Sequence, residues 1–136
     1  MNWNSLGDVK LLIADDDAFN RQLIIALLVK MPNIEVVEAR DGLEALKILR
    51  QNSIDMLLLD YHMPKMNGDE LLKRIKKESR LSKIPVAIIT TDESDMRHLY
   101  ALGADDFILK PFDFQELRHC IYRHIQEKEN RTICRV

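Results

Sequence analysis

Five short apolar runs alternate with helix-like segments along this chain, and this alternation constrains its fold more than any other feature. Several runs are aliphatic with little apolar/polar alternation, as in strands of a parallel sheet that is covered on both faces. Strand–helix alternation with short connections favours a doubly wound α/β sandwich. The expected strands are Lys10–Ala14, Ile34–Ala39, Asp55–Asp60, Pro85–Thr90 and Asp106–Lys110, and the expected helices lie near residues 18–30, 42–51, 68–78, 93–102 and 114–128.

Local signals mark several ends of the expected helices. Asp41 with Glu44, and Asp113 with Glu116, have the spacing of a capping box at a helix start. Gly103 follows Leu102 at a position that favours a helix C-cap. We see no internal linker or low-complexity segment, so we expect a single domain.

Charge and hydropathy narrow the possible functions. The net charge is −2 and the pI is about 6.1, which argues against broad binding to a nucleic-acid backbone. No apolar run approaches the roughly 20 residues of a membrane span, and the N-terminus lacks a signal-peptide pattern. Two cysteines do not make a disulfide framework, so a reducing cytoplasm is expected. Cys120 and His124 could share a helix face, but two ligands are too few for a zinc site, and a buried thiol is favoured.

Polar side chains follow the expected strands at the points where they end. Asp15 and Asp16 follow the first strand, Asp60 ends the third, Thr90 ends the fourth and Lys110 ends the fifth. Sites in open α/β sheets form outside the carboxyl ends of the strands, so these groups should meet at one edge. The acidic pair at 105–106 precedes its strand, and we therefore expect it in loops and turns at the opposite edge.

The chemistry of these groups favours phosphoryl transfer. Converging carboxylates repel one another unless a cation neutralises them, and hard oxygen ligands suit Mg²⁺. Thr90 and Lys110 are suitable donors to a phosphoryl group, and an Asp can act as nucleophile to form an acyl phosphate. Each feature alone also has a plain structural explanation. Asp17, for instance, is expected to cap the next helix.

Four motifs surround these strand ends, namely "LLIADDDAFNR", "DMLLLDYHMPKMNGDELL", "PVAIITTDES" and "GADDFILKPF". In these motifs the sequence resembles a receiver domain of the bacterial two-component response regulators. The resemblance covers residues 8–126, between an N-terminal extension of residues 1–7 and a polar C-terminal tail of residues 127–136. It implies a flavodoxin-like sandwich with a five-stranded parallel sheet in the order 2-1-3-4-5 and five helices.

The resemblance also implies residue roles. Asp60 would be the phosphoacceptor, Thr90 and Lys110 would contact the phosphoryl oxygens, and Thr90 would act with Phe107 as the switch. The cofactor would be Mg²⁺ or Mn²⁺, and the Lys110–Pro111 peptide bond would be cis. The metal ligands would be Asp15 (mainly through water), Asp16, Asp60 and the His62 carbonyl, and the backbone N–H groups of Tyr61, His62 and Thr91 would complete the phosphoryl cradle.

Some positions depart from common choices in the family. Phe107 replaces a frequent Tyr, and its apolar ring can be buried without a partner for a hydroxyl. Thr91 is larger than the usual Ala or Gly and narrows access to the phosphoryl group, so we expect slower self-dephosphorylation than in relatives with smaller residues. His62 and Asp92 occupy variable positions that influence the approach of water. The remaining histidines, His98, His119 and His124, are expected on helix surfaces.

The function implied is a switch rather than an enzyme with a separate substrate. A histidine kinase or histidine phosphotransfer domain would supply the phosphoryl group, and a downstream effector protein or output domain would respond. The output face would cover Ser94–Leu102 and Phe107–Gln126, with a possible phosphorylation-dependent homodimer through it. No direct contact with nucleic acid or membrane is expected, and the setting would be the bacterial cytoplasm.

Three other functions are considered, of which the first stays open and the other two are disfavoured by the residues. A phosphorylation-independent interaction module of the same fold is the main alternative, although the complete acceptor set argues against it. A haloacid-dehalogenase-type phosphohydrolase would place its nucleophile after the first strand in a DxDx(T/V) pattern, which "DDDAF" lacks. A nucleotide-binding domain is disfavoured because neither GxGxxG nor GxxxxGK(S/T) follows the first strand.

Overall fold

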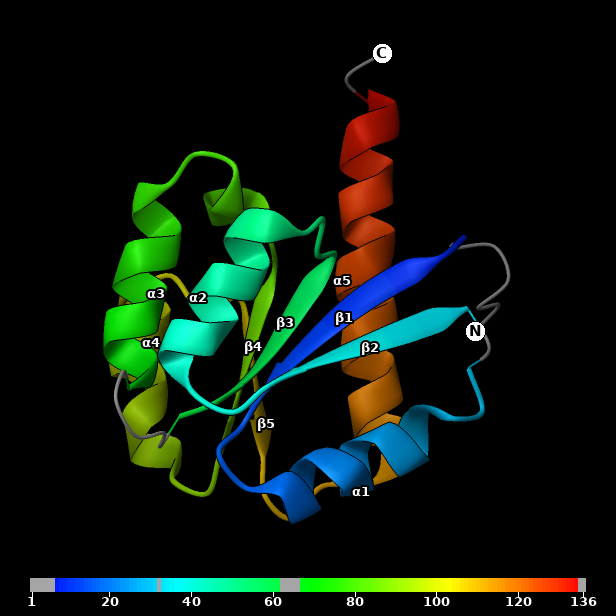
Figure 1. The fold of residues 1–136 in the computed structure, drawn as a ribbon, viewed down its shortest axis with the longest axis vertical. Coiled ribbons are helices and arrows are strands. Elements are labelled where there is room, and N and C mark those ends of the chain that lie inside the picture. The colour runs from blue at the N-terminus through cyan, green and yellow to red at the C-terminus, as the bar shows by residue number, and fades with distance from the viewer. Residues whose placement is uncertain (1–6, 32, 62–66, 135–136) are drawn as a thin grey trace.

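The alternation of strands and helices builds a three-layer sandwich around one parallel sheet (Figure 1). The computed structural model describes residues 7–31, 33–61 and 67–134, with side chains described as far as residue 126. The sheet has the order β2-β1-β3-β4-β5, which confirms the predicted flavodoxin-like topology. The strands are β1 (Val9–Ala14), β2 (Ile34–Ala39), β3 (Met56–Asp60), β4 (Val86–Thr90) and β5 (Asp106–Leu109).

The helices agree closely with the predicted segments. They are α1 (Ala18–Leu28), α2 (Gly42–Gln51), α3 (Gly68–Lys77), α4 (Met96–Ala101) and α5 (Phe114–Cys134), with short 3₁₀ turns at Leu81–Lys83 and Glu93–Asp95. The segment predicted as one helix over 93–102 thus begins with a 3₁₀ turn, and α5 continues through most of the predicted polar tail. The Glu, Lys and Arg residues of that tail are good helix formers, which accounts for the extension.

Alternate residues of the central strands pack against different helices. On one face, Leu12, Leu57 and Ile88 belong to a core shared with α2, α3 and α4. On the other face, Leu58 and Ile89 belong to a core shared with α1 and α5. Because both faces are covered, β3 and β4 are buried along their whole length, as the uninterrupted aliphatic runs indicate.

The capping signals fix where several helices begin and end. The Asp41 carboxylate accepts a hydrogen bond from the Glu44 N–H at 2.8 Å, and Asp113 accepts one from Glu116 at 2.9 Å. Gly103 has φ +109°, the left-handed conformation expected after a helix C-cap. These contacts confirm the predicted starts of α2 and α5 and the end of α4.

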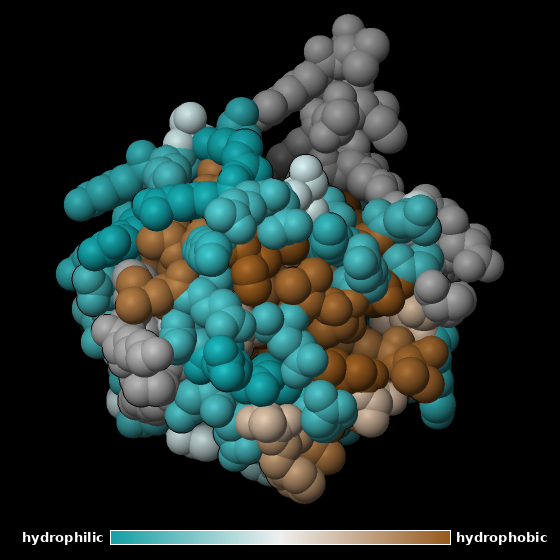
Figure 2. All heavy atoms as spheres, in the orientation of Figure 1, coloured by the Kyte–Doolittle hydropathy of each residue, from teal (hydrophilic) through white to brown (hydrophobic). Residues whose placement is uncertain are grey.

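The β2 edge of the sheet faces the viewer in Figure 1, beside α1. Hydrophobic residues gather where β2 and α1 lie, whereas hydrophilic residues cover much of the surrounding surface (Figure 2). Phe19, Leu23 and Val29, in or just after α1, are exposed large hydrophobic residues. No helix among the described residues is long and apolar enough to cross a membrane.

Candidate functional site

The carboxyl ends of β1 and β3 bring three acidic side chains together. Ala14 pairs with Leu59 across the two strands, so the residues that follow them emerge side by side. Carboxylate oxygens of Asp15, Asp16 and Asp60 all lie within 4.8 Å of one another. We refer to this group of three carboxylates as the acidic cluster.

Two of the three carboxylates in the acidic cluster are buried. Asp15 is 3% exposed and Asp60 is 9% exposed, whereas Asp16 is open to solvent. Burial raises the pKa of Asp15, against the lowering effects of a hydrogen bond from the Asp17 N–H and of the Lys110 charge. Because carboxylates at such short range repel, the cluster favours a bound cation, and its hard oxygen donors match the preference of Mg²⁺.

The end of β5 brings a positive charge to the acidic cluster. The Lys110 ammonium lies 3.7 Å from a carboxylate oxygen of Asp60. Its backbone N–H donates to the Thr90 carbonyl at 2.9 Å, which ties the end of β5 to the end of β4. The Lys110–Pro111 peptide bond is cis. This lysine is therefore positioned to neutralise negative charge that develops beside Asp60.

The end of β4 contributes a buried hydroxyl. Thr90 is 2% exposed, and its Oγ1 accepts a hydrogen bond from the Asp92 N–H at 3.2 Å. The Asp92 side chain in turn accepts a hydrogen bond from the Ser94 N–H, and it thereby caps the 3₁₀ turn that precedes α4. Thr91 is exposed. The Thr90 hydroxyl is thus linked through the chain to the start of α4.

Tyr61 connects the acidic cluster to α3 and α4. Its backbone N–H donates to the Ile89 carbonyl at 3.2 Å, so a phosphoryl oxygen would have to share that donor. Burial, followed by a hydrogen bond with the Asp69 carboxylate, raises the pKa of the Tyr61 phenol to about 12. Asp69 also pairs with His98 at 2.5 Å. The roles predicted for His62 lie outside the described residues.

Arg21 supports the acidic cluster and was not among the predicted site residues. It is 8% exposed, and its Nη1 donates to the Asp15 carbonyl at 2.6 Å while its Nε donates to Glu38 at 2.9 Å. Arg21 stands three and seven residues before the buried Ile24 and Leu28. That helical spacing was the signal that could have identified it as an inward-facing arginine.

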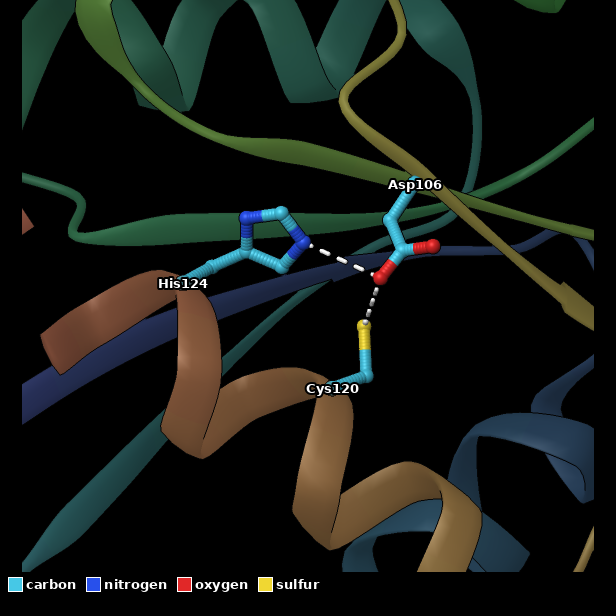
Figure 3. A group of neighbouring side chains, drawn as sticks. All are labelled: Asp106, Cys120 and His124. Carbon is cyan, nitrogen blue, oxygen red and sulfur yellow. Dashed lines mark hydrogen bonds and ion pairs between the residues drawn. The ribbon is translucent and has the colours of Figure 1, made fainter. Parts of the chain in front are cut away.

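A second polar cluster lies away from the acidic cluster, at the start of β5. Asp105 accepts a hydrogen bond from the Val86 N–H at the opposite end of β4, as the strand order predicts. Asp106 is more than a turn acid, because its Oδ2 accepts from His124 at 3.0 Å and from Cys120 at 3.4 Å (Figure 3). Arg123 also forms an ion pair with it.

The expectation that His124 lies on a helix surface is wrong. His124 is 9% exposed and turns toward β5, whereas His98 and His119 are exposed. Cys120 is buried, as predicted, and burial raises the pKa of its thiol. The carboxylate of Asp106, which lies far away in the sequence, draws His124 inward because it supplies a partner for the imidazole.

This second cluster leads to a prediction about acid stability. Burial opposes ionisation of Asp106, but hydrogen bonds from His124, Phe107 and Cys120, together with the Arg123 charge, lower its pKa to about 2. A carboxylate whose pKa is lower in the folded state than in the unfolded state stabilises the protein at pH values above its unfolded-state pKa. This stabilisation is lost as the pH falls through the folded-state pKa. At pH 7 we expect Asp106→Asn to lower the free energy of unfolding by about 2 kcal/mol. Urea unfolding should show that difference shrinking between about pH 4 and pH 2. A difference that stays constant over this range would contradict the assignment.

The residues predicted for the output face divide into core and surface. Leu99 is fully buried, whereas Tyr100 is 46% exposed. The Tyr100 and Phe107 rings meet edge to face, with centroids 4.6 Å apart. Phe107 also packs against the core on the α2–α4 side of the sheet. An aromatic contact therefore joins α4 to β5. Helix α4 is the next α-helix after Thr90, and β5 ends just before Lys110.

Comparisons with known proteins agree with this geometry. The family model for the response regulator receiver domain matches residues 11–122. A chemotaxis protein CheY homolog of Campylobacter jejuni is 34% identical over 113 residues, which cover 81% of this chain and 87% of that protein. A transcriptional regulatory protein CpxR homolog of Haemophilus influenzae is 42% identical over 110 residues, 79% of this chain but 46% of that protein.

A solved structure extends the similarity to three dimensions. The chemotaxis response regulator CheY4 of Vibrio cholerae superposes with a TM-score of 0.78 at 30% sequence identity. The superposition covers 86% of this chain and 98% of that protein. The similarity therefore extends over nearly all of the sheet and its helices.

Proposed function

The chain belongs to the response regulator receiver domain family of two-component signalling, and on that premise we propose that it is a phosphorylation-controlled switch with Asp60 as its phosphoacceptor. The observation that carries the proposal is the convergence of the acidic cluster with the Lys110 ammonium, 3.7 Å from Asp60. Receiver domains are signalling switches and are not usually classed as enzymes. We place the receiver unit at residues 8–126.

The covalent step forms an acyl phosphate on this chain. An oxygen of the Asp60 carboxylate attacks phosphorus, and the bond from phosphorus to the donor breaks, with its electron pair leaving on the imidazole nitrogen of a phosphohistidine. Lys110 neutralises charge that builds on the phosphoryl oxygens, and the Thr90 hydroxyl donates to one of them. The buried surroundings of Asp60 strengthen both interactions.

The donor set of the acidic cluster fits a divalent metal. Asp15, Asp16 and Asp60 supply hard oxygen ligands from the ends of two strands, and Mg²⁺ or Mn²⁺ matches them. Such a cation, when bound, would neutralise charge on the transferring phosphoryl group. Arg21 holds the Asp15 backbone in place, and the Asp17 N–H orients the Asp15 carboxylate from 2.9 Å.

The conformational response begins at Thr90. A phosphoryl group on Asp60 adds negative charge and acceptor oxygens that draw the Thr90 hydroxyl toward them and away from the Asp92 N–H. That hydrogen bond connects to the start of α4, whose Tyr100 contacts Phe107. The output face of α4, β5 and α5 would then change its affinity for an effector protein, an output domain or a second copy of the chain.

The test of the proposal is the intact mass of the protein after incubation with acetyl phosphate and Mg²⁺, with and without a chelator. We expect one added phosphoryl group that depends on the metal. If no adduct forms, beryllofluoride binding distinguishes the remaining explanations. Binding would indicate an acyl phosphate lost too quickly to observe, whereas no binding by the folded protein would overturn the proposal in favour of a phosphorylation-independent module.

The size of Thr91 is expected to set the lifetime of the phosphorylated state. Thr91 follows Thr90 at the mouth of the site and is exposed, so its side chain restricts the approach of water. We expect Thr91→Ala to shorten the lifetime of the acyl phosphate severalfold. The measurement is the decay of phosphorylated protein after the phosphodonor is removed, and an unchanged lifetime would rule out this role.

A further inference from the structure

The second cluster carries the side chains of a transition-metal site. Asp106 comes from the start of β5, and Cys120 and His124 stand four residues apart on the face of α5 that packs against the sheet (Figure 3). A carboxylate oxygen, the thiol sulfur and an imidazole nitrogen all lie within 4.8 Å of one another. We propose that Asp106, Cys120 and His124 bind Zn²⁺ or a similar borderline-soft divalent metal, with water as the fourth ligand.

The present distances are close to those that a tetrahedral metal requires. Zinc bond lengths to oxygen, nitrogen and sulfur imply ligand separations of about 3.3 Å between oxygen and nitrogen and about 3.5 Å between oxygen and sulfur. Asp106 Oδ2 now lies 3.0 Å from His124 Nε2 and 3.4 Å from Cys120 Sγ. These two separations would have to widen only slightly. The main rearrangement is displacement of Arg123, whose Nη2 pairs with Asp106 and lies 3.3 Å from His124 Nε2.

The ligand types select the class of metal. Thiolate and imidazole favour zinc and its neighbours over Mg²⁺, whereas the acidic cluster offers only oxygens. The Asp106, Cys120 and His124 site should therefore prefer Zn²⁺ and similar metals, and the acidic cluster should prefer Mg²⁺. The binding of a soft metal at Cys120 does not depend on the proposed phosphorylation of Asp60.

Binding exchanges protons for the metal. The Cys120 thiol loses its proton to solvent as the sulfur–metal bond forms. His124 gives up the Nε2 proton that it donates to Asp106, takes its single proton on Nδ1 by tautomerisation through solvent, and binds the metal through Nε2. The Arg123 guanidinium, whose side chain is 46% exposed, releases Asp106 and turns into solvent. Because one thiol proton is released, the affinity for the metal should rise about tenfold for each unit by which the pH is raised, as long as the pH stays below the thiol pKa.

A cavity open to solvent reaches two of the three proposed ligands, Asp106 and Cys120. A cavity of about 360 Å³ is lined by Asp106 and Cys120 together with Phe107, Glu116, His119 and Arg123. This cavity can admit a hydrated ion and hold the water ligand. A metal there would clamp α5 to β5 directly beside Phe107, on the face proposed for output.

The test uses Co²⁺ as a spectroscopic probe, with excess Mg²⁺ present to occupy the acidic cluster. We expect one equivalent of Co²⁺ to give tetrahedral d–d absorption and a thiolate charge-transfer band, and Zn²⁺ to bleach both. Cys120→Ser should abolish the charge-transfer band, and His124→Asn should weaken affinity at least tenfold. The matched control is Cys134→Ser, which changes the other cysteine of the chain and should retain the band.

Three outcomes would overturn the proposal. They are the absence of a charge-transfer band in the wild type, a band that survives in Cys120→Ser, and a band lost in Cys134→Ser instead. Beryllofluoride binding and circular dichroism of each variant report whether it is folded. A variant that fails to fold is replaced by Cys120→Ala, for which the same loss of the band is expected and its persistence would count against the site.

Discussion

Replacing Asp60 with Asn is expected to abolish phosphorylation by acetyl phosphate. The amide is nearly isosteric with the carboxylate, but it carries no negative charge and is a poor nucleophile toward phosphorus. Asp60 is the carboxylate that lies 3.7 Å from the Lys110 ammonium, and no other acid of the cluster is paired with a cation in this way among the described residues. The measurement is intact mass after incubation with acetyl phosphate and Mg²⁺, and the Asp60→Asn protein should gain no adduct.

The matched control is Asp17→Asn in the same acidic run. Asp17 accepts a hydrogen bond from the Phe19 N–H and caps α1, and an Asn can make that same contact. We therefore expect Asp17→Asn to fold normally and to accept one phosphoryl group. If Asp60→Asn is still modified, peptide mapping would identify a different acceptor and the assignment of Asp60 would fail.

Replacing Lys110 with Ala is expected to slow phosphorylation without loss of Mg²⁺ binding. Removal of one preorganised group that stabilises transition-state charge typically costs about 10²–10³-fold in rate. The same change takes a positive charge away from the acidic cluster, so its affinity for Mg²⁺ should stay constant or rise. The two measurements are the rate of adduct formation and a Mg²⁺ titration.

A comparison with Asp16→Asn separates the two effects. Asp16 supplies an oxygen to the acidic cluster but is not paired with Lys110, so this change should weaken Mg²⁺ binding directly. Equal losses of metal affinity in Lys110→Ala and Asp16→Asn would show that the lysine supports the structure of the cluster. A loss of rate alone in Lys110→Ala would show that it acts on the phosphoryl group.

The acidic cluster was predictable because it depends on where residues stand relative to strand ends. In a parallel sheet every strand presents its carboxyl end to the same edge, so chain position alone places Asp15, Asp60, Thr90 and Lys110 together. The same rule assigned Asp105 to the opposite edge, where it binds the start of β4. Capping residues were predictable for a similar reason, because their partners lie within a few residues.

Partners far apart in sequence were not predictable in this way. His124 was expected on the surface, although it stands four residues after Cys120 on the buried face of its helix. The sequence did not indicate its partner Asp106, which lies 18 residues earlier. The same holds for His98 and Asp69, which join α4 to α3, and for Arg21 and Glu38, which join α1 to β2. A sequence pattern indicates which face of a helix is apolar, but it does not indicate which polar side chain will pair with a side chain of a neighbouring helix or strand.

The sequence by itself determined the order of strands and helices along the chain, the coverage of the sheet on both faces and the edge at which the acidic cluster forms, because these follow from local periodicity and the parallel direction of the strands. The order of the strands within the sheet was implied only by the resemblance to receiver domains. Only the tertiary structure decided the distances between side chains, such as the pairing of Lys110 with Asp60 and the convergence of Cys120 and His124 on Asp106. Those contacts depend on how the layers pack. Packing fixes separations to tenths of an ångström, a scale on which hydropathy patterns carry no information.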